Sequence, residues 1–177
     1  MKIEANRIRV LLIEDHGPTA AMLTAMLTGL GFSKVSHAGN VSRAIEMLRE
    51  SACDLILCDF QLGIVNGLML VRMIRRPDGV AQANIPIIMI TAHADPERVA
   101  EAQGAGVNDF LVKPVVPEKL QRCLMQALER PRPFVKTKTY AGPDRRRKQT
   151  YDHPGRRRED REGRPAPKNI WVVPPKS

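Results

Sequence analysis

The sequence predicts an α/β domain built around a buried parallel sheet, and two observations carry that prediction. Short apolar runs alternate with segments whose apolar residues recur at helical spacing, as expected for strands covered by helices on both faces. In addition, four of the runs stop at charged or polar residues, which are Glu14-Asp15, Asp59, Thr91 and Lys113. Ligands bind at the carboxyl ends of strands in open α/β sheets, so we expect these endings to meet in one crevice.

The first strand is the run 10–13, and a helix follows from Thr19 to Leu30. Its core-facing residues are expected to be Met22, Leu23, Met26, Leu27 and Leu30. Gly31 stands where glycine commonly ends a helix. The second strand is expected at 34–38. The helix after it has one apolar face, made by Val41, Ala44, Ile45 and Leu48.

The run 55–58 is the third strand, and the helix after it covers 68–74. That helix ends at 75–79, because Pro77 cannot continue the helical hydrogen bonds and Asp-Gly favours a turn. The remaining elements continue the alternation: a strand at 87–90, a helix from Pro96, a strand at 110–112 and a helix over 118–128.

The charged endings suit phosphoryl transfer assisted by a divalent cation. Glu14, Asp15 and Asp59 would repel one another if all were ionised without a cation. Mg²⁺ prefers oxygen ligands and is commonly held by one or two carboxylates together with phosphate oxygens. Asp59 could then attack a phosphoryl group, while Lys113 neutralises its oxygens and the Thr91 hydroxyl donates a hydrogen bond. The product would be an aspartyl phosphate.

Each of these residues also has an ordinary structural explanation. Asp15 could cap the helix that follows it, Thr91 is a common strand residue, and Lys113 could be a plain surface charge. The convergence of all of them on one sheet edge favours the functional interpretation.

At these positions the chain resembles the receiver domain of bacterial two-component response regulators, a CheY-like domain, over residues 7 to 130. The motifs that carry the resemblance are Glu14-Asp15, Asp59, Thr91-Ala92 and Lys113-Pro114, with Phe110 three residues before the lysine. The resemblance implies a flavodoxin-like, doubly wound sheet of five parallel strands in the order 2-1-3-4-5. It also implies a cis peptide bond before Pro114.

The resemblance further implies which residues bind the metal. Mg²⁺ would be held by Glu14, Asp15, Asp59 and the backbone carbonyl of Gln61, and Asp59 would accept the phosphoryl group. After Asp59 the family's usual Met-Pro is replaced by Leu62-Gly63. Glycine is expected to loosen this loop, because it lacks the fixed dihedral angle of proline.

The resemblance also implies how the domain signals. Thr91 and Lys113 would assist the transfer, and Thr91 and Phe110 would be the switch residues. Phosphorylation would bias an existing two-state equilibrium of the face made by the fourth helix, fifth strand and fifth helix. The phosphoryl donor would be a sensor histidine kinase or a phosphotransfer protein. Such a chain is a signalling phosphoprotein and not an enzyme, apart from its own phosphorylation and dephosphorylation.

Composition sets the outer limits. A chain of 177 residues that is 43% hydrophobic can form one domain with a core plus an appendage. No apolar run approaches the roughly 20 residues needed to span a bilayer, and no signal peptide opens the sequence, so we expect a cytoplasmic protein. Cys53, Cys58 and Cys123 lie in or beside apolar segments, which predicts buried, reduced thiols.

Residues 131–177 differ from residues 1–130 in charge. The first 130 residues contain 14 Lys and Arg and 14 Asp and Glu, whereas the last 47 contain 14 and 5, so the net charge of +9 belongs to the tail. The tail also holds 8 of the 14 prolines. We therefore predict a receiver domain over 1–130 and a disordered, basic, Pro/Arg-rich tail over 131–177.

A weak repeat lies inside the tail, because a tyrosine, a proline and an arginine triplet of residues 140–147 return in residues 151–158. The arginines could bind phosphates and the tyrosines could stack on bases, so nucleic acid is one candidate partner. An acidic protein, an anionic membrane face and the domain's own crevice are others, and charge runs are also often only solubilising. The segment 170–173 could add to a sheet edge as a short strand.

The sequence as a whole predicts a response regulator that is switched by phosphorylation of Asp59 and acts through protein contact. One alternative is a nucleic-acid-binding regulator whose tail supplies affinity through counterion release. The other is a phosphate sink without an output. Salt-sensitive DNA binding that is lost on deletion of residues 131–177 would favour the first alternative.

Overall fold

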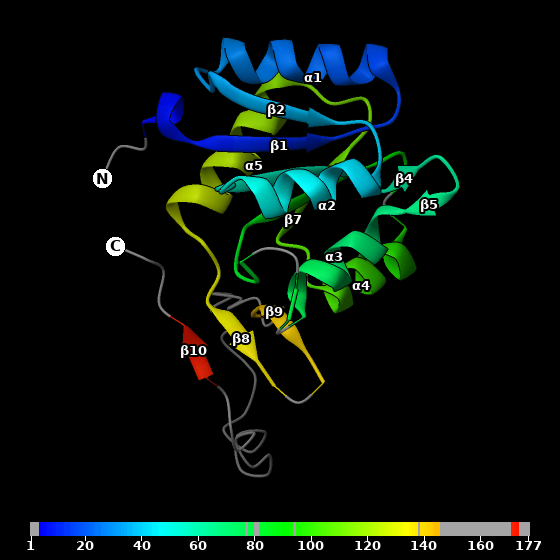
Figure 1. The fold of residues 1–177 in the computed structure, drawn as a ribbon, viewed down its shortest axis with the longest axis vertical. Helices are drawn as coiled ribbons and strands as arrows, with labels where there is room; N and C mark the ends of the chain where they lie inside the picture. Colours follow the sequence, from blue (N-terminus) through cyan, green and yellow to red (C-terminus); the bar gives the residue numbers. More distant parts are fainter. Residues whose placement is uncertain are drawn as a thin grey trace, which may run out of the picture.

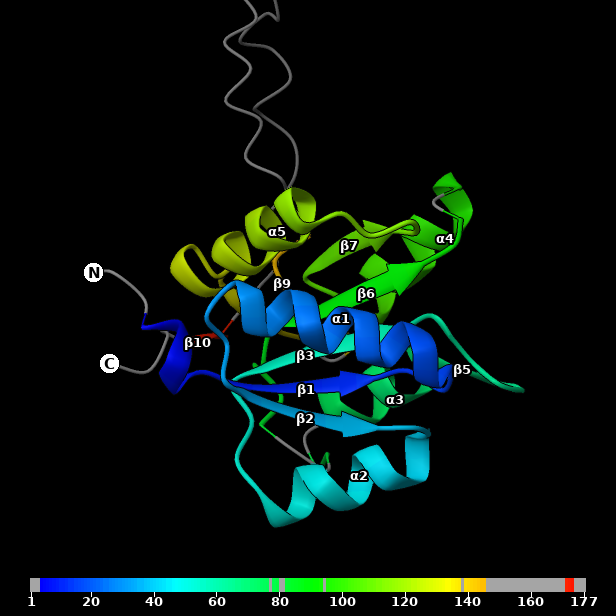
Figure 2. The same cartoon turned by 90° about the horizontal axis from the view of Figure 1, so that it is seen from above.

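A five-stranded parallel sheet forms the centre of the computed structural model, which describes residues 4–76, 78–79, 82–93, 95–137, 139–145 and 171–173. Its strands are β1 (Arg9–Ile13), β2 (Lys34–Ala38), β3 (Leu55–Asp59), β6 (Ile87–Thr91) and β7 (Asp109–Val112). They lie in the order β2-β1-β3-β6-β7, and every neighbouring pair is parallel (Figure 1 labels β1, β2 and β7, and Figure 2 labels all five). The predicted order 2-1-3-4-5 is therefore confirmed.

Helices cover both faces of this sheet (Figure 2). The α-helices of the described chain are α1 (Gly17–Gly29), α2 (Val41–Glu50), α3 (Gly67–Arg75), α4 (Pro96–Ala105) and α5 (Pro117–Glu129), and a 3-10 turn, η1 (Ala5–Arg7), precedes β1. Alternate strand residues point to opposite faces. Val10 and Leu12 accordingly pack with α1 and α5, whereas Leu11 and Ile13 pack with α2, α3 and α4. This is the doubly wound arrangement.

The helix ends follow from local chemistry. The Asn40 side chain accepts a hydrogen bond from the Arg43 amide at the start of α2, and the Asp95 side chain accepts one from the Arg98 amide at the start of α4. Gly106 ends α4 with a φ of +101°, a backbone conformation that favours glycine.

One packing prediction for α1 is wrong. Met22 was expected in the core but is 43% exposed. The helix begins earlier than predicted, at Gly17, and the residues of α1 that are buried are Ala20, Leu23 and Leu27. These three positions are spaced by three and four residues, so they form a narrow stripe that leaves Met22 outside it.

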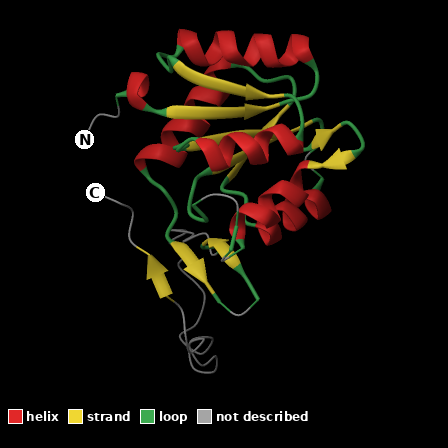
Figure 3. Cartoon of the chain, viewed as in Figure 1, coloured by secondary structure: helices red, strands yellow, loops and turns green. Residues whose placement is uncertain are grey.

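The prediction of disorder from residue 131 onward is wrong for part of that segment. Strands β8 (Phe134–Lys136) and β9 (Ala141–Pro143) form an antiparallel hairpin, and β10 (Trp171–Val173) pairs with the other edge of β8 (Figure 3). Phe134 and Val135 are buried because the hairpin packs on the domain, a contact that the composition of the segment does not reveal. Of the predicted short strand at 170–173, residues 171–173 are present as β10, and Ile170 lies outside the described residues. The second copy of the repeat, 151–158, lies outside the described residues.

Two further expectations concern single features. The bond between Lys113 and Pro114 is cis, as the resemblance implied. Cys58 and Cys123 are buried free thiols, whereas Cys53 is only partly buried. Over the part of the chain that the structure describes, every helix is too short or too polar to cross a membrane.

Candidate functional site

The four predicted strand endings meet at one edge of the sheet. Glu14 follows β1, Asp59 ends β3, Thr91 ends β6 and Lys113 follows β7, so each is placed by the carboxyl end of a parallel strand. Together with their neighbours they line a cleft of about 400 Å³. Long-range parallel pairing therefore gathers side chains that are up to 99 positions apart in the sequence.

Lys113 forms the contacts that tie the cleft together. Its Nζ atom lies 2.5 Å from Asp59 Oδ2 and 3.2 Å from Glu14 Oε2. Asp59 is 6% exposed and Glu14 is 1% exposed, whereas Asp15 reaches the solvent. Carboxylate oxygens of Glu14, Asp15 and Asp59 all lie within 4.8 Å of one another. Three carboxylates thus lie close together, and the ammonium group of Lys113 contacts two of them, those of Glu14 and Asp59.

Among these carboxylates, Glu14 has a pKa that is raised by its surroundings. Burial raises the pKa of Glu14, the nearby charge of Asp59 raises it further, and Lys113 opposes the rise. Burial also lowers the pKa of Lys113, but hydrogen bonds and charges from Asp59 and Glu14 outweigh that effect, so the pKa is raised overall. Lys113 is therefore fully charged at neutral pH, and the cleft retains an excess of negative charge.

The donor set fits a hard divalent cation. Carboxylate oxygens in a small, negatively charged cluster are the ligands that Mg²⁺ prefers, and the cleft leaves space for waters and phosphate oxygens. Glu14, Asp15 and Asp59 would supply the side-chain oxygens. The backbone carbonyl of Gln61 remains a predicted further ligand, and Gln61 lines the same cleft.

The loop after Asp59 contains regular secondary structure. Strands β4 (Gln61–Leu62) and β5 (Val65–Asn66) pair as a small antiparallel ribbon, and Leu62 is buried. The Gln61 amide donates a 3.3 Å hydrogen bond to Asp59 Oδ1. Gly63 turns the ribbon with a φ of +60°, which proline cannot adopt. Glycine therefore suits this turn, and the looser placement of the Gln61 carbonyl stays a prediction.

The two predicted switch residues lie in different environments. Thr91 is 2% exposed, and its hydroxyl donates a 2.7 Å hydrogen bond to the carbonyl of His93. The same oxygen accepts a 3.2 Å hydrogen bond from the His93 amide. Phe110 is partly buried and packs against the core beneath α2, α3 and α4. In this conformation the Thr91 hydroxyl is engaged by the loop and makes no hydrogen bond to Asp59.

Sequence reasoning missed the importance of Gly67, the first residue of α3. A Cβ atom at this position would lie 2.3 Å from the Asp59 carbonyl oxygen and 3.1 Å from Cys58 Sγ. The Gly67 amide also donates a 2.8 Å hydrogen bond to the Phe60 carbonyl. Asn66-Gly67 was a visible signal, but it reads as ordinary turn chemistry until the distance to Asp59 is known.

Arg98 is a second residue that the sequence did not single out. It lines the cleft from α4, and its guanidinium lies 5.4 Å from the centre of the Phe60 ring. Its Nε atom also lies 3.2 Å from Asp95 Oδ2. Arg98 therefore places a further positive charge at the rim of the cleft.

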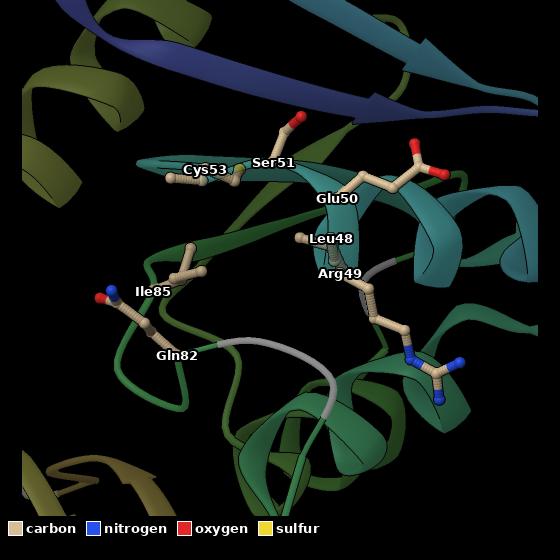
Figure 4. Close-up of a pocket in the computed structure, with 8 residues that line it drawn as sticks. Leu48, Arg49, Glu50, Ser51, Cys53, Gln82 and Ile85 are labelled. Atoms are coloured by element: carbon tan, nitrogen blue, oxygen red, sulfur yellow. The ribbon is translucent and has the colours of Figure 1, made fainter.

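A second hollow lies at the opposite end of the sheet. Its volume is about 280 Å³, and it is lined by residues 48–53 at the end of α2 together with Gln82 and Ile85 (Figure 4). Burial raises the pKa of the Cys53 thiol, which keeps it protonated and weakly nucleophilic. Because this hollow adjoins the amino ends of β3 and β6, it is not where an open α/β sheet places its chemistry.

The crowding of carboxylates gives a first testable prediction. Glu14→Gln removes a buried negative charge while keeping the side-chain shape, so we expect the variant to melt higher than the wild type in EDTA. We expect the melting temperature to rise by a few degrees, which corresponds to about 1 kcal/mol of unfolding free energy in a domain of this size. Adding Mg²⁺ should raise the melting temperature of the wild type more than that of the variant. Thermal unfolding followed by circular dichroism measures both effects.

The matched control is Glu129→Gln, an exposed residue in the last turn of α5. It should change neither the melting temperature in EDTA nor the response to Mg²⁺. A Glu14→Gln variant that melts lower than the wild type in EDTA would show that the contact with Lys113 outweighs the repulsion.

Comparison with known proteins agrees with this geometry. The family model described as the response regulator receiver domain matches residues 10–125. Chemotaxis protein CheY of Pseudomonas aeruginosa is 27% identical over 123 residues, which make up 70% of this chain and 98% of that protein. DNA-binding response regulator MtrA of Mycolicibacterium smegmatis is 35% identical over 118 residues, which make up 67% of this chain and 49% of that protein.

Solved structures give the same result. The receiver domain of sensor histidine kinase PA1611 from Pseudomonas aeruginosa, with a magnesium ion coordinated in its active site cleft, matches with a TM-score of 0.61 and 30% identity. That match covers 69% of this chain and 98% of the other. Vibrio cholerae CheY4 matches with a TM-score of 0.63 and 27% identity, covering 68% and 98%. In contrast, the chain spans about half the length of MtrA and 27% of transcriptional regulatory protein ZraR from Klebsiella oxytoca.

Proposed function

Because this chain belongs to the response regulator receiver family, we propose that it is switched by phosphorylation of Asp59 in a two-component phosphorelay. The observation that carries the proposal is the contact of one lysine, Lys113, with two buried carboxylates, those of Asp59 and Glu14. A buried carboxylate at a strand end, with a fixed ammonium beside it, is suited to attack phosphorus and to stabilise the product.

In the proposed transfer, a carboxylate oxygen of Asp59 forms a bond to phosphorus. The bond between phosphorus and the donor breaks, and its electron pair stays on the donor, which is the imidazole of a histidine kinase or phosphotransfer protein. Lys113 neutralises charge on the phosphoryl oxygens. Mg²⁺, held by Glu14, Asp15, Asp59 and the Gln61 carbonyl, would supply further neutralisation of those oxygens when bound.

The same geometry supports a switch. To bond a phosphoryl oxygen, the Thr91 hydroxyl must leave its 2.7 Å hydrogen bond with His93, so the loop between β6 and α4 must change with it. Phe110 lies on β7 opposite Met89 of β6, two residues before Thr91 on that strand, and would move inward as that loop moves. The two states of this region would differ in population according to phosphorylation.

We propose that the output face comprises α4, β7 and α5. Two apolar side chains at this edge remain exposed. Val112 on β7 is 40% exposed, and Val116, just before α5, is 37% exposed. Exposed apolar residues beside a conformational switch suit contact with a downstream protein. The signal would then pass by protein contact, with the family's usual donors upstream.

The test is metal-dependent phosphorylation of the intact chain. Incubation with a small-molecule phosphodonor and Mg²⁺ should give one acid-stable, base-labile phosphoryl group per chain, as expected of an acyl phosphate. Excess EDTA should suppress the labelling, because the carboxylates of Glu14, Asp15 and Asp59 then repel the incoming phosphoryl group. A chain that stays unlabelled at saturating phosphodonor and Mg²⁺ would overturn the proposal.

A further inference from the structure

The hairpin of β8 and β9 is fitted against the receiver domain at the end of the sheet opposite Asp59. Gly106, which precedes β7, marks the contact: a Cβ atom there would lie 3.0 Å from the Ala141 carbonyl oxygen. A Cβ atom on Gly142 would lie 2.8 Å from the Gly106 Cα atom and 2.5 Å from the Tyr140 hydroxyl. Two glycines from distant parts of the sequence thus allow the backbones to approach closely.

A buried cation lies directly behind this contact. Arg75, the last residue of α3, is 4% exposed, and its guanidinium lies 5.8 Å from the centre of the Phe134 ring of β8. It donates hydrogen bonds to neutral oxygens only, which are the carbonyls of Ala83, Ile85 and Gly106 and the side chain of Asn108. Its hydrogen-bonding groups are satisfied, but its charge is not neutralised by any carboxylate that the structure describes.

The pKa of Arg75 reflects burial without an anionic partner among the described residues. Burial lowers the pKa of Arg75 to about 9, with the negative form of Tyr140 opposing the change, so the guanidinium still carries its charge at neutral pH. A charged group that has lost water without gaining an anionic partner is stabilised by any anion that binds nearby.

The docked hairpin and the helix ends enclose a groove of about 240 Å³ in front of Arg75. Arg72 and Arg76 line it from α3 and its C-terminal cap, and Lys136 lines it from β8. Arg72 is paired with Glu101 at 2.9 Å, whereas Arg76 and Lys136 are exposed and make no ion pair within the described residues. Among the residues that the structure describes, those that line the groove include no Asp or Glu.

An aromatic ring and a further arginine extend this basic surface. Tyr140 lines the groove, and the Arg145 guanidinium lies 4.0 Å from the centre of its ring. Arg145 lies two residues after β9 and opens the most basic part of the sequence. Asp144 is the acidic residue beside Tyr140, and Glu101 is the one beside Arg72.

We propose that this groove binds the phosphate backbone of a nucleic acid. Planar guanidinium groups bind phosphate oxygens in pairs, and an aromatic ring beside them can stack on a base. A nucleic acid fits better than an acidic peptide because the sequence of residues 131–177, which supplies the hairpin, has 14 basic and 5 acidic residues, and polyanions of repeating charge bind such segments strongly. The unphosphorylated chain should bind, so this inference stands apart from the proposed phosphorylation of Asp59.

The test is fluorescence anisotropy with labelled single-stranded DNA, double-stranded DNA and RNA, measured over a range of salt concentrations with the unphosphorylated full chain. The double variant Arg76→Ala/Lys136→Ala should reduce the salt slope for duplex DNA by about 2 and weaken binding at low salt at least about tenfold. The matched control, Lys34→Ala/Arg49→Ala, removes the same two residue types from exposed positions on β2 and α2 and should leave the slope nearly unchanged.

A second variant tests the shape of the groove at constant charge. Gly142→Ala should push the hairpin away from Gly106 and weaken binding without changing the net charge, while the far-ultraviolet circular dichroism of the domain is retained. If the two double variants lost affinity for nucleic acid equally, or if Gly142→Ala kept full affinity, the proposed binding in the groove would be overturned in favour of non-specific electrostatic attraction. Tighter binding of a poly-glutamate peptide than of every nucleic acid tested would also overturn the proposal, in favour of an acidic protein partner.

Discussion

Asp59→Asn is expected to abolish phosphorylation by a small-molecule phosphodonor in the presence of Mg²⁺. Asparagine keeps the size of the side chain, and its one amide oxygen can still accept the hydrogen bond of either Lys113 or the Gln61 amide, so the fold should be preserved. It lacks the anionic oxygen that attacks phosphorus. Loss of a nucleophile commonly costs about a thousandfold or more, which places the residual labelling below detection. The measurement is the incorporation of base-labile phosphate per chain.

The control for this variant is Asp78→Asn, at an exposed aspartate between α3 and β6. It should be labelled at the wild-type rate and to the same extent. If Asp59→Asn were still labelled, the acceptor would be a different carboxylate, with Asp15 the nearest exposed candidate in the cleft. Mapping of the modified peptide by mass spectrometry would identify it.

Gly67→Ala is expected to impair both stability and phosphorylation, although the residue carries no functional group. Its Cβ atom would lie 2.3 Å from the Asp59 carbonyl oxygen, which is backbone and cannot rotate away. The start of α3 or the end of β3 must therefore move. Overpacking of this kind typically costs about 1–3 kcal/mol of unfolding free energy. A displacement of Asp59 by a fraction of an ångström to 1 Å should slow labelling by roughly ten- to a hundredfold.

Urea unfolding and the initial rate of labelling measure the two effects of Gly67→Ala separately. The control is Gly29→Ala, in the last turn of α1, where an added Cβ atom meets nothing within 4 Å. That change should be neutral or slightly stabilising, because alanine favours the helix more than glycine does. Wild-type stability and wild-type labelling in Gly67→Ala would show that α3 yields without moving Asp59.

The sequence alone predicted the parallel sheet and the convergence of Glu14, Asp15, Asp59, Thr91 and Lys113 in the cleft, but not the part of Arg98. Buried strands are apolar throughout, so their ends are visible as the first polar residues, and Asp59 and Lys113 stand out for that reason. Parallel strands align their carboxyl ends, which makes convergence predictable without knowing any distance. The sequence could not predict that Thr91 bonds to His93, because the direction of a hydroxyl depends on the loop around it.

The tertiary structure decided the remainder, and the C-terminal hairpin is the clearest example. Its own residues bury too little apolar surface to fold, so composition predicted disorder from residue 131. The residues that it packs against, Arg75 and Gly106, lie far away in the sequence, and no local sequence pattern indicates that they contact the hairpin. Gly67 is similar, because its sequence looks like that of any turn glycine. Only the folded structure shows that a Cβ atom there would lie 2.3 Å from the Asp59 carbonyl oxygen. Local patterns encode which residues are buried, whereas contacts between distant segments depend on how the folded elements fit together.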